Sequence, residues 1–144
     1  MGTEKLKIHL IFFALVILQL SIFSGVSVAS AASDEKDIEA LIENLNAQDV
    51  DVKADSIKTL VEAGENAVGP LIQALDSKDP EIRENAAITL GKIKDERAID
   101  PLIKLLTDEE WEVESAANNA LVEIGKPAVE PLIKILQDKN EDVF

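Results

Sequence analysis

The side chains that most often carry catalysis are scarce in this sequence. It has no cysteine, no tyrosine and one histidine, His9, so thiolate nucleophiles, disulfides, thiolate metal sites and histidine acid–base pairs have no candidates after residue 9. The 28 acidic side chains could still work in pairs as acid and base. Acids scattered over helix faces more often keep a surface solvated. We therefore expect no enzyme activity, no catalytic residue and no cofactor.

The most distinctive local stretch is "TDEEWEVE", residues 107–114, in which the only tryptophan stands among five acids. An exposed Trp111 in this setting could anchor a basic partner. Alternatively, Trp111 covers the hydrophobic edge between two structural units, because a tryptophan buries much apolar area without help from a ligand. We favour the covering role and keep Trp111 as a contact candidate.

Acids also gather at the boundaries between the predicted helices. Part of this is expected, since acids stabilise helix N-termini. The stretch "DVDVKAD" from Asp49 is similar to the start of an EF-hand calcium loop, but it lacks the required glycine and the closing glutamate. We predict no metal ligands, and retain a cell-surface ligand or calcium-binding role as an alternative function. Adaptation to high salt would also explain the acidity.

The net charge of −14 limits the classes of partner. Proteins that bind DNA, RNA or anionic lipid rely on lysine and arginine, and a field of this sign repels phosphates. We expect a protein partner, with a basic one favoured by charge, and no nucleic acid.

The N-terminus has the layout of a signal peptide. Lys5 and Lys7 precede the apolar run "IHLIFFALVILQLSIF", and small residues follow it. The small-x-small rule places cleavage after Ala31, or after Ala29. An uncleaved membrane anchor is the alternative, because residues 6–28 are long enough to span a bilayer. We predict a secreted or cell-surface protein that loses His9 on cleavage, with contact to a membrane only if the segment stays.

Three segments, "NAVGPLIQAL", "RAIDPLIKLL" and "KPAVEPLIKIL", share one pattern, and their prolines Pro70, Pro101 and Pro131 lie 31 and 30 residues apart. Upstream of each lies a segment with apolar or small residues at steps of four, four and three, which define one helix face. The chain is thus predicted to be all-α, an α-solenoid of about three and a half helix-turn-helix repeats. The aligned face positions are Val52, Ser56, Leu60 and Ala63, then Ile82, Ala86, Leu90 and Ile93, then Val113, Ala117, Leu121 and Ile124.

Gly64 and Gly125 stand where the first helix of a repeat should stop, since glycine adopts left-handed conformations without strain. Each proline is then expected in the first turn of a second helix, where a backbone N–H has no intrahelical partner anyway. The predicted boundaries are residues 1–31 for the signal peptide or anchor and 32–144 for the repeat domain, with a capping helix at 37–48, repeats at 49–77, 78–107 and 108–138, and the truncated start of a further repeat at 139–144.

The middle repeat, "DPEIRENAAITLGKIKDERAIDPLIKLL", resembles the HEAT-like repeats typified by the phycobilisome lyase family, and the likeness covers residues 37–144. It implies a superhelical binding surface. It also implies acid–base bonds between turns, from Asp79 and Arg83 in repeat 2. Glu110 and Glu114 take these places in repeat 3, so we expect the third turn to lack this brace. The iron hydroxylases of HEAT type need His–Glu pairs, which this chain cannot supply. The lyases act on tetrapyrroles, so an accessory role in a tetrapyrrole-lyase-like system is a further alternative.

We therefore predict an exported, non-enzymatic HEAT-repeat protein that acts as a scaffold or adaptor for a protein partner. The concave surface of such a stack is usually lined by the second helix of each repeat. The bare C-terminal end, where Val143 and Phe144 begin another helix, also favours end-to-end self-association. The contact candidates are Gln73, Asp100, Lys104, Trp111, Glu130 and Lys134.

Overall fold

The computed structural model describes residues 37–141, with side chains as far as Gln137. The predicted signal peptide and the Val143–Phe144 end lie outside these residues. The chain divides into two units, Met1–Asp37 and Ile38–Phe144, and the second is the repeat region. After a helix at 37–43, its elements are η1 (Asn44–Asn46), α2 (Val50–Ala63), α3 (Glu65–Ala74), α4 (Pro80–Ile93), η2 (Glu96–Ala98), α5 (Ile99–Lys104), η3 (Leu105–Thr107), α6 (Trp111–Ile124) and α7 (Lys126–Glu141).

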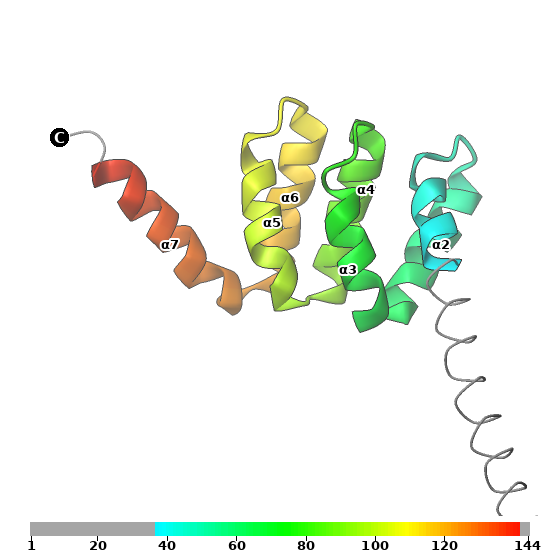
Figure 1. Cartoon of the computed structure of the whole chain (residues 1–144), viewed down its shortest axis with the longest axis horizontal. Helices are drawn as coiled ribbons and strands as arrows, with labels where there is room; N and C mark the ends of the chain where they lie inside the picture. Colours follow the sequence, from blue (N-terminus) through cyan, green and yellow to red (C-terminus); the bar gives the residue numbers. More distant parts are fainter. Residues whose placement is uncertain (1–36, 142–144) are drawn as a thin grey trace, which may run out of the picture. The chain divides into compact units, whose positions relative to one another are not determined.

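The helices of the repeat region form two rows. The first helices of the repeats, α2, α4 and α6, pack side by side, with the most extensive contact between α4 and α6 (Figure 1). The second helices, α3, α5 and α7, form the other row. Of these, α3 packs against α4 and α5 packs against α6, in each case the first helix of the next repeat. No strand occurs within residues 37–141, so the predicted all-α repeat architecture is confirmed.

The first helices are held together by the predicted face of small and branched apolar residues. Leu60, Leu90 and Leu121 are almost fully buried, and burial of a leucine side chain contributes about 1.5–3 kcal/mol. At the small positions, Ser56, Ala86 and Ala117 are buried too. The closest approach between two first helices, however, lies at another position, Gly91.

Gly91 of α4 meets α6 directly. A Cβ atom at this position would lie 2.7 Å from the Cα and 2.9 Å from the Cβ of Ala120. Real Cβ atoms do not approach a backbone atom so closely, so glycine is required here for α4 and α6 to pack at this distance. The sequence pattern contains Gly91 but does not reveal this contact.

The turns within the repeats differ in length. Gly64 (φ 56°) and Gly125 (φ 79°) have the positive φ angles that favour glycine, and each is the single residue between the two helices of its repeat. In repeat 2, Lys94 takes the left-handed conformation at φ 61°, and Asp95 then caps the short helix η2 by accepting the backbone N–H of Arg97. The longer turn of repeat 2 thus replaces glycine with a local cap.

The predicted place of the prolines is wrong in two repeats. Because one glycine completes the turn, α3 begins at Glu65 and α7 at Lys126, so Pro70 and Pro131 lie inside these helices rather than in the first turn. A proline there leaves the carbonyl four residues earlier without its intrahelical donor. Pro101 does lie in the first turn of α5.

The side chains of the second helices are less buried toward the C-terminus of the repeat region. In α3 and α5 the broad apolar stripe is largely buried, but Ala128 is the only buried side chain among residues 126–137 of α7. None of the helices in the described part of the chain has the length and apolar content of a membrane span.

Candidate functional site

All six predicted contact residues have exposed side chains. Gln73 lies on α3, Asp100 and Lys104 lie on α5, and Glu130 and Lys134 lie on α7, so these five follow the second helices. Trp111 instead begins α6, on the row of first helices. The structure therefore does not gather the six residues into one pocket.

The expectation that Trp111 covers the edge between two repeats is wrong, because its surface is 71% exposed. Trp111 is the first residue of α6, as Val50 is of α2 and Pro80 of α4. Val50 and Pro80 are exposed as well, since the first position of each of these helices points away from the core. Because proline is mostly exposed in proteins, the alignment of Trp111 with Pro80 is the sequence signal for this exposure.

We call residues 47–49, 75–79 and 108–110, which lead into the first helices α2, α4 and α6, the junction turns. A cavity of about 580 Å³ lies between the second and the third junction turn. Of the predicted contact residues, Lys104 lines it, and Trp111 directly follows Glu110, which lines it too. The lining residues carry both charges: Asp76, Asp108, Glu109 and Glu110, with Lys78, Arg83 and Lys104.

Arg83 and Asp108 tie the two junction turns together in this cavity. Arg83 Nε donates to Asp108 Oδ2 at 3.0 Å and Nη2 donates to Oδ1 at 2.9 Å, while Nη1 donates to the Ser77 carbonyl at 2.8 Å. The two side chains are only 15% and 10% exposed. These hydrogen bonds lower the pKa of Asp108 and raise the pKa of Arg83, because each stabilises the charge of the other. The pair has a structural role and is not free for a ligand.

This brace corrects one expectation for repeat 3. The third junction turn was expected to lack a link between turns, but its Asp108 is held by Arg83 of repeat 2. The acid and the base of repeat 2 also face opposite neighbours. Asp79 accepts a 2.7 Å hydrogen bond from Asn46, the last residue of η1, just before the preceding junction turn, and this bond lowers the pKa of Asp79. Arg83 instead reaches forward. One repeat therefore joins the turns on both sides of it.

A buried polar bridge and an ion pair support the same side of repeat 2. Asn85 Nδ2 donates to the carbonyl of Leu45 at 3.0 Å, and Lys53 of α2 pairs with Glu81 of α4. No buried side-chain nitrogen or oxygen atom lacks a hydrogen-bond partner among the described residues.

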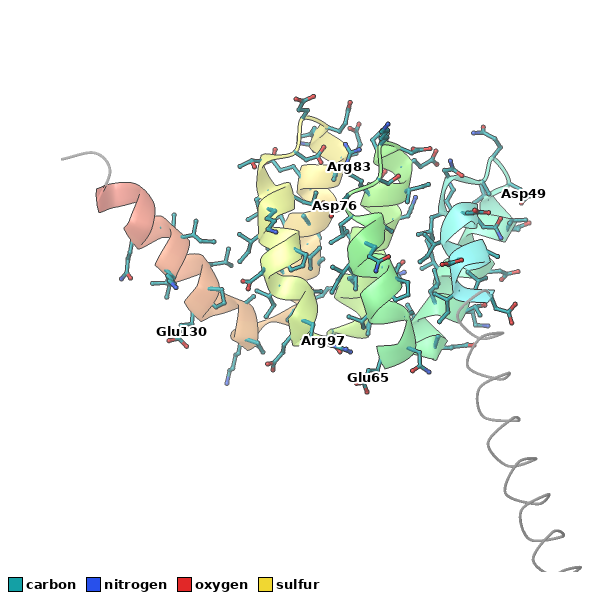
Figure 2. The ribbon with its side chains drawn as sticks, in the orientation of Figure 1. Asp49, Glu65, Asp76, Arg83, Arg97 and Glu130 are labelled. Carbon is teal, nitrogen blue, oxygen red and sulfur yellow. The ribbon has the colours of Figure 1, made fainter. Side chains whose placement is uncertain are left out.

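The turns within the repeats carry a weaker link at the opposite edge. Arg97 makes a two-pronged contact with Asp95, at 2.9 and 2.8 Å, which lowers the pKa of Asp95 to about 2. It also lies 3.7 Å from an exposed carboxylate oxygen of Glu65 in the previous repeat. Figure 2 shows Asp49, Asp76 and Arg83 at the edge of the junction turns and Glu65, Arg97 and Glu130 at the opposite edge.

Several junction acids serve as helix caps. Asp49 accepts the backbone N–H groups of Asp51 and Val52 at the start of α2, and Asp79 accepts that of Glu81 at the start of α4. The calcium-loop-like stretch from Asp49 is therefore mostly helical. Among the residues that the structure describes, no group of three or more acids, histidines or cysteines could hold a metal ion.

A comparison with solved structures found proteins that are similar to this chain. Two solved structures with significant likeness are a crystal structure of an engineered protein, which is 26% identical over 65% of this chain and 50% of that chain with a TM-score of 0.45, and a structure of human deoxyhypusine hydroxylase in complex with glycerol, which is 28% identical over 73% of this chain and 38% of that chain with a TM-score of 0.54. The chain thus spans half or less of these two proteins. A comparison with curated protein sequences gave no significant match.

The family model for HEAT repeats matches residues 38–110 and again 71–144. The two matches together cover the whole region of paired helices and include the junction turns with their capping acids. HEAT repeats indicate a role in protein–protein interaction. The phycobilisome lyase sub-type expected from the sequence is not established by this match. The chain belongs to the HEAT repeat family.

Proposed function

We propose that this protein is an exported, non-enzymatic scaffold that binds a basic segment of a protein partner around Trp111. The observation that carries the proposal is the 71% exposure of the Trp111 side chain. Large exposed aromatic residues are frequent among the residues that dominate binding energy in protein interfaces.

The fold does not require a tryptophan at this position. The equivalent first residues of α2 and α4 are Val50 and Pro80, which are both exposed, so a small apolar residue serves the helix start equally well. An indole ring that contributes little to the core and faces solvent exposes a large apolar area. Contact with a partner would remove this area from water.

The charges around Trp111 favour a cation. Asp108 is engaged by Arg83. The side chains of Glu109, Glu110, Glu112 and Glu114 are exposed, and they form no ion pair with the side chains of residues 37–137. A lysine or arginine above the indole ring would gain a cation–π interaction and the attraction of these acids. We therefore infer a partner with exposed basic side chains.

The residues of the repeat region support the non-enzymatic part of the proposal. The sequence from residue 37 onward has no histidine, cysteine or tyrosine, and the described residues form no metal-binding group. The likeness to a hydroxylase concerns 38% of that enzyme. The clustered acids of this chain cap helices or face solvent, which does not provide a positioned acid and base.

The binding site can be tested with the tryptophan itself. Residues 32–144 contain one tryptophan, so the fluorescence of Trp111 reports on its surroundings without interference. We expect titration with hexalysine to change this fluorescence and hexaglutamate to leave it unchanged. By calorimetry, Trp111→Ala should weaken binding of hexalysine about tenfold, which corresponds to about 1.4 kcal/mol. Unchanged affinity in Trp111→Ala would contradict the proposed site.

Two matched controls separate a site from general charge attraction. Val50→Ala truncates an exposed apolar residue at the equivalent helix position and should leave the affinity unchanged. Glu110→Lys with Glu112→Lys should weaken binding more than Glu39→Lys with Glu43→Lys, which alters the net charge equally in another exposed segment. Equal losses for the two double variants would show that net charge alone attracts the peptide. The same variants then serve as bait in pull-down experiments, where loss of a partner with Trp111→Ala connects it to this surface.

Export is tested separately on the full chain. Production in a host with a secretory pathway should give a protein outside the cytoplasm whose mass corresponds to a start at Ala32. Retention of the full mass in the membrane fraction would favour the uncleaved anchor instead.

A further inference from the structure

The C-terminal face of the repeat region exposes apolar side chains whose counterparts in earlier repeats are covered. Val129 of α7 is 53% exposed, whereas the equivalent residues Val68 and Ile99 are 0% and 5% exposed. Ile133 is 48% exposed, whereas Ile72 and Ile103 are partly buried against the core. Only the last repeat shows this pattern.

The neighbouring first helix shows the same difference. Val122 of α6 is 72% exposed, and its counterpart in α4 is Gly91, which packs against Ala120 of the next first helix. Val122 and Val129 flank the turn at Gly125, so they lie at the same end of the repeat region. Figure 1 shows α7 leading away from α5 and α6 toward its C-terminal end. We call Val122, Val129 and Ile133 the end face.

The end face differs in chemistry from the surface around Trp111. Its polar border on α7 consists of Lys126, Glu130 and Lys134, all exposed, so it carries both signs of charge and gives no preference for a basic partner. A suitable occupant must bring branched apolar side chains together with one acid and one base at helical spacing. A second α7 has this composition.

We propose that two copies of this chain pair through their end faces, with the α7 helices antiparallel about a twofold axis. A twofold axis midway between residues 131 and 132 leaves Val129 and Ile133 of the second copy only about 1.5 Å apart along the helix axis, since a helix rises about 1.5 Å per residue. The same axis also leaves Glu130 about 1.5 Å along the helix from Lys134 of the second copy, and the twofold symmetry repeats both pairs. The face is thus complementary to itself in apolar contact and in charge.

The pairing is weak, and its response to salt is characteristic. Three side chains per copy form a smaller contact than the interfaces of about 800 Å² per partner that are usual in stable complexes. Two chains with a net charge of −14 each repel one another at low ionic strength, and salt screens this repulsion. Added salt therefore strengthens the pairing, whereas it weakens attraction of a basic peptide to the acids near Trp111.

Sedimentation equilibrium of residues 32–144 over a wide range of concentration tests the pairing. We expect the mean mass to rise from that of a monomer toward that of a dimer, at lower concentrations in 0.5 M than in 0.05 M NaCl. Val129→Asp should weaken association at least tenfold. The matched control Val52→Asp alters a 41% exposed valine of α2, outside the end face, and should leave association unchanged.

Charge reversal tests the register. Lys134→Glu alone places like charges opposite each other and should weaken association, and adding Glu130→Lys should restore it. A monomer at all concentrations, failure of the double reversal to restore association, a mass that rises beyond the dimer, or an equal loss with Val52→Asp would each overturn the proposal. Circular dichroism of each variant shows that the helices are intact. Binding of hexalysine is measured in the same variants, so failure of the pairing leaves the site at Trp111 separately testable.

Discussion

At the scale of single residues, the positions that decide this structure are those where a small or turn-forming side chain is required. Gly64 and Gly125 could be recognised from the sequence, since each follows a helical pattern and precedes another. Gly91 could not, because its role depends on the distance between α4 and α6 and not on any local pattern. The prediction that Trp111 is buried failed for a similar reason. Tryptophan is a large apolar residue, but its type does not show in which direction the first residue of a helix points.

We expect Gly91→Ala to destabilise the protein by about 1–3 kcal/mol, because its Cβ would overlap the backbone of Ala120 in α6. Gly69→Ala is the matched control, since Gly69 also lies within a helix but a Cβ there meets no atom within 4 Å. This control should change the stability by less than about 1 kcal/mol, because the gain in helix propensity is opposed by the contact of a Cβ with the ring of Pro70. Urea unfolding followed by circular dichroism measures both, and a loss in both variants would show that helix geometry rather than the contact decides.

At the scale of elements, the order of helices and the register of the repeats were predictable because period and helical spacing are properties of the sequence. The beginnings of α3 and α7 were not. A one-residue glycine turn moved the start of α3 and α7 ahead of the predicted position and left Pro70 and Pro131 within the helices. Bonds between turns were expected, but their partners were not predictable, because no sequence pattern shows that Arg83 reaches forward to Asp108 while Asp79 is bonded by Asn46.

The Arg83–Asp108 pair predicts a dependence of stability on pH. The pKa of Asp108 is lower in the folded protein than its unfolded value of about 3.9, so the pair stabilises the fold above that pH and this contribution is lost as the pH falls through the lowered pKa. Asp108→Asn should therefore lose about 1–3 kcal/mol at pH 7 and show a smaller further loss between pH 4 and pH 2 than the unaltered protein.

Urea unfolding at several pH values checks this expectation. Asp76→Asn, which alters an exposed carboxyl group that lines the same cavity, should cause a much smaller loss at pH 7. If the stability of Asp108→Asn falls between pH 4 and pH 2 as much as that of the unaltered protein, other carboxyl groups cause the loss at acid pH.

At the scale of the whole repeat region, stability should be distributed unevenly along the stack. The fully buried leucines lie before repeat 1 (Leu45), in repeat 1 (Leu60 and Leu71) and in repeat 2 (Leu90 and Leu102). In addition, α4 packs against first helices on both sides, α2 and α6. In α7 only Ala128 is buried among residues 126–137. The sequence predicts the repeats but not how deeply each one is buried, because burial at a given position depends on the helices that pack over it.

We expect amide hydrogen exchange to be slowest in α4 and the facing half of α6, and faster by orders of magnitude in α7 beyond residue 132. The physical reason is that exchange in α7 needs only local opening, whereas exchange in α4 needs the loss of the shared core. Mass spectrometry of exchanged peptides measures the difference. Equal protection in α4 and α7 at low protein concentration would contradict the uneven distribution.

The two edges of the stack are also fastened with unequal strength. At the junction turns, Asn46 with Asp79 and Arg83 with Asp108 bind at 2.7–3.0 Å with little exposure, whereas the opposite edge has the 3.7 Å contact of Arg97 with Glu65 at 53% and 84% exposure. A pulling force or a large bound partner would therefore separate the repeats first at the turns that contain Gly64 and Arg97. The junction turns at the other edge would stay together and act as the hinge. Elastic bending of this protein should have a preferred direction.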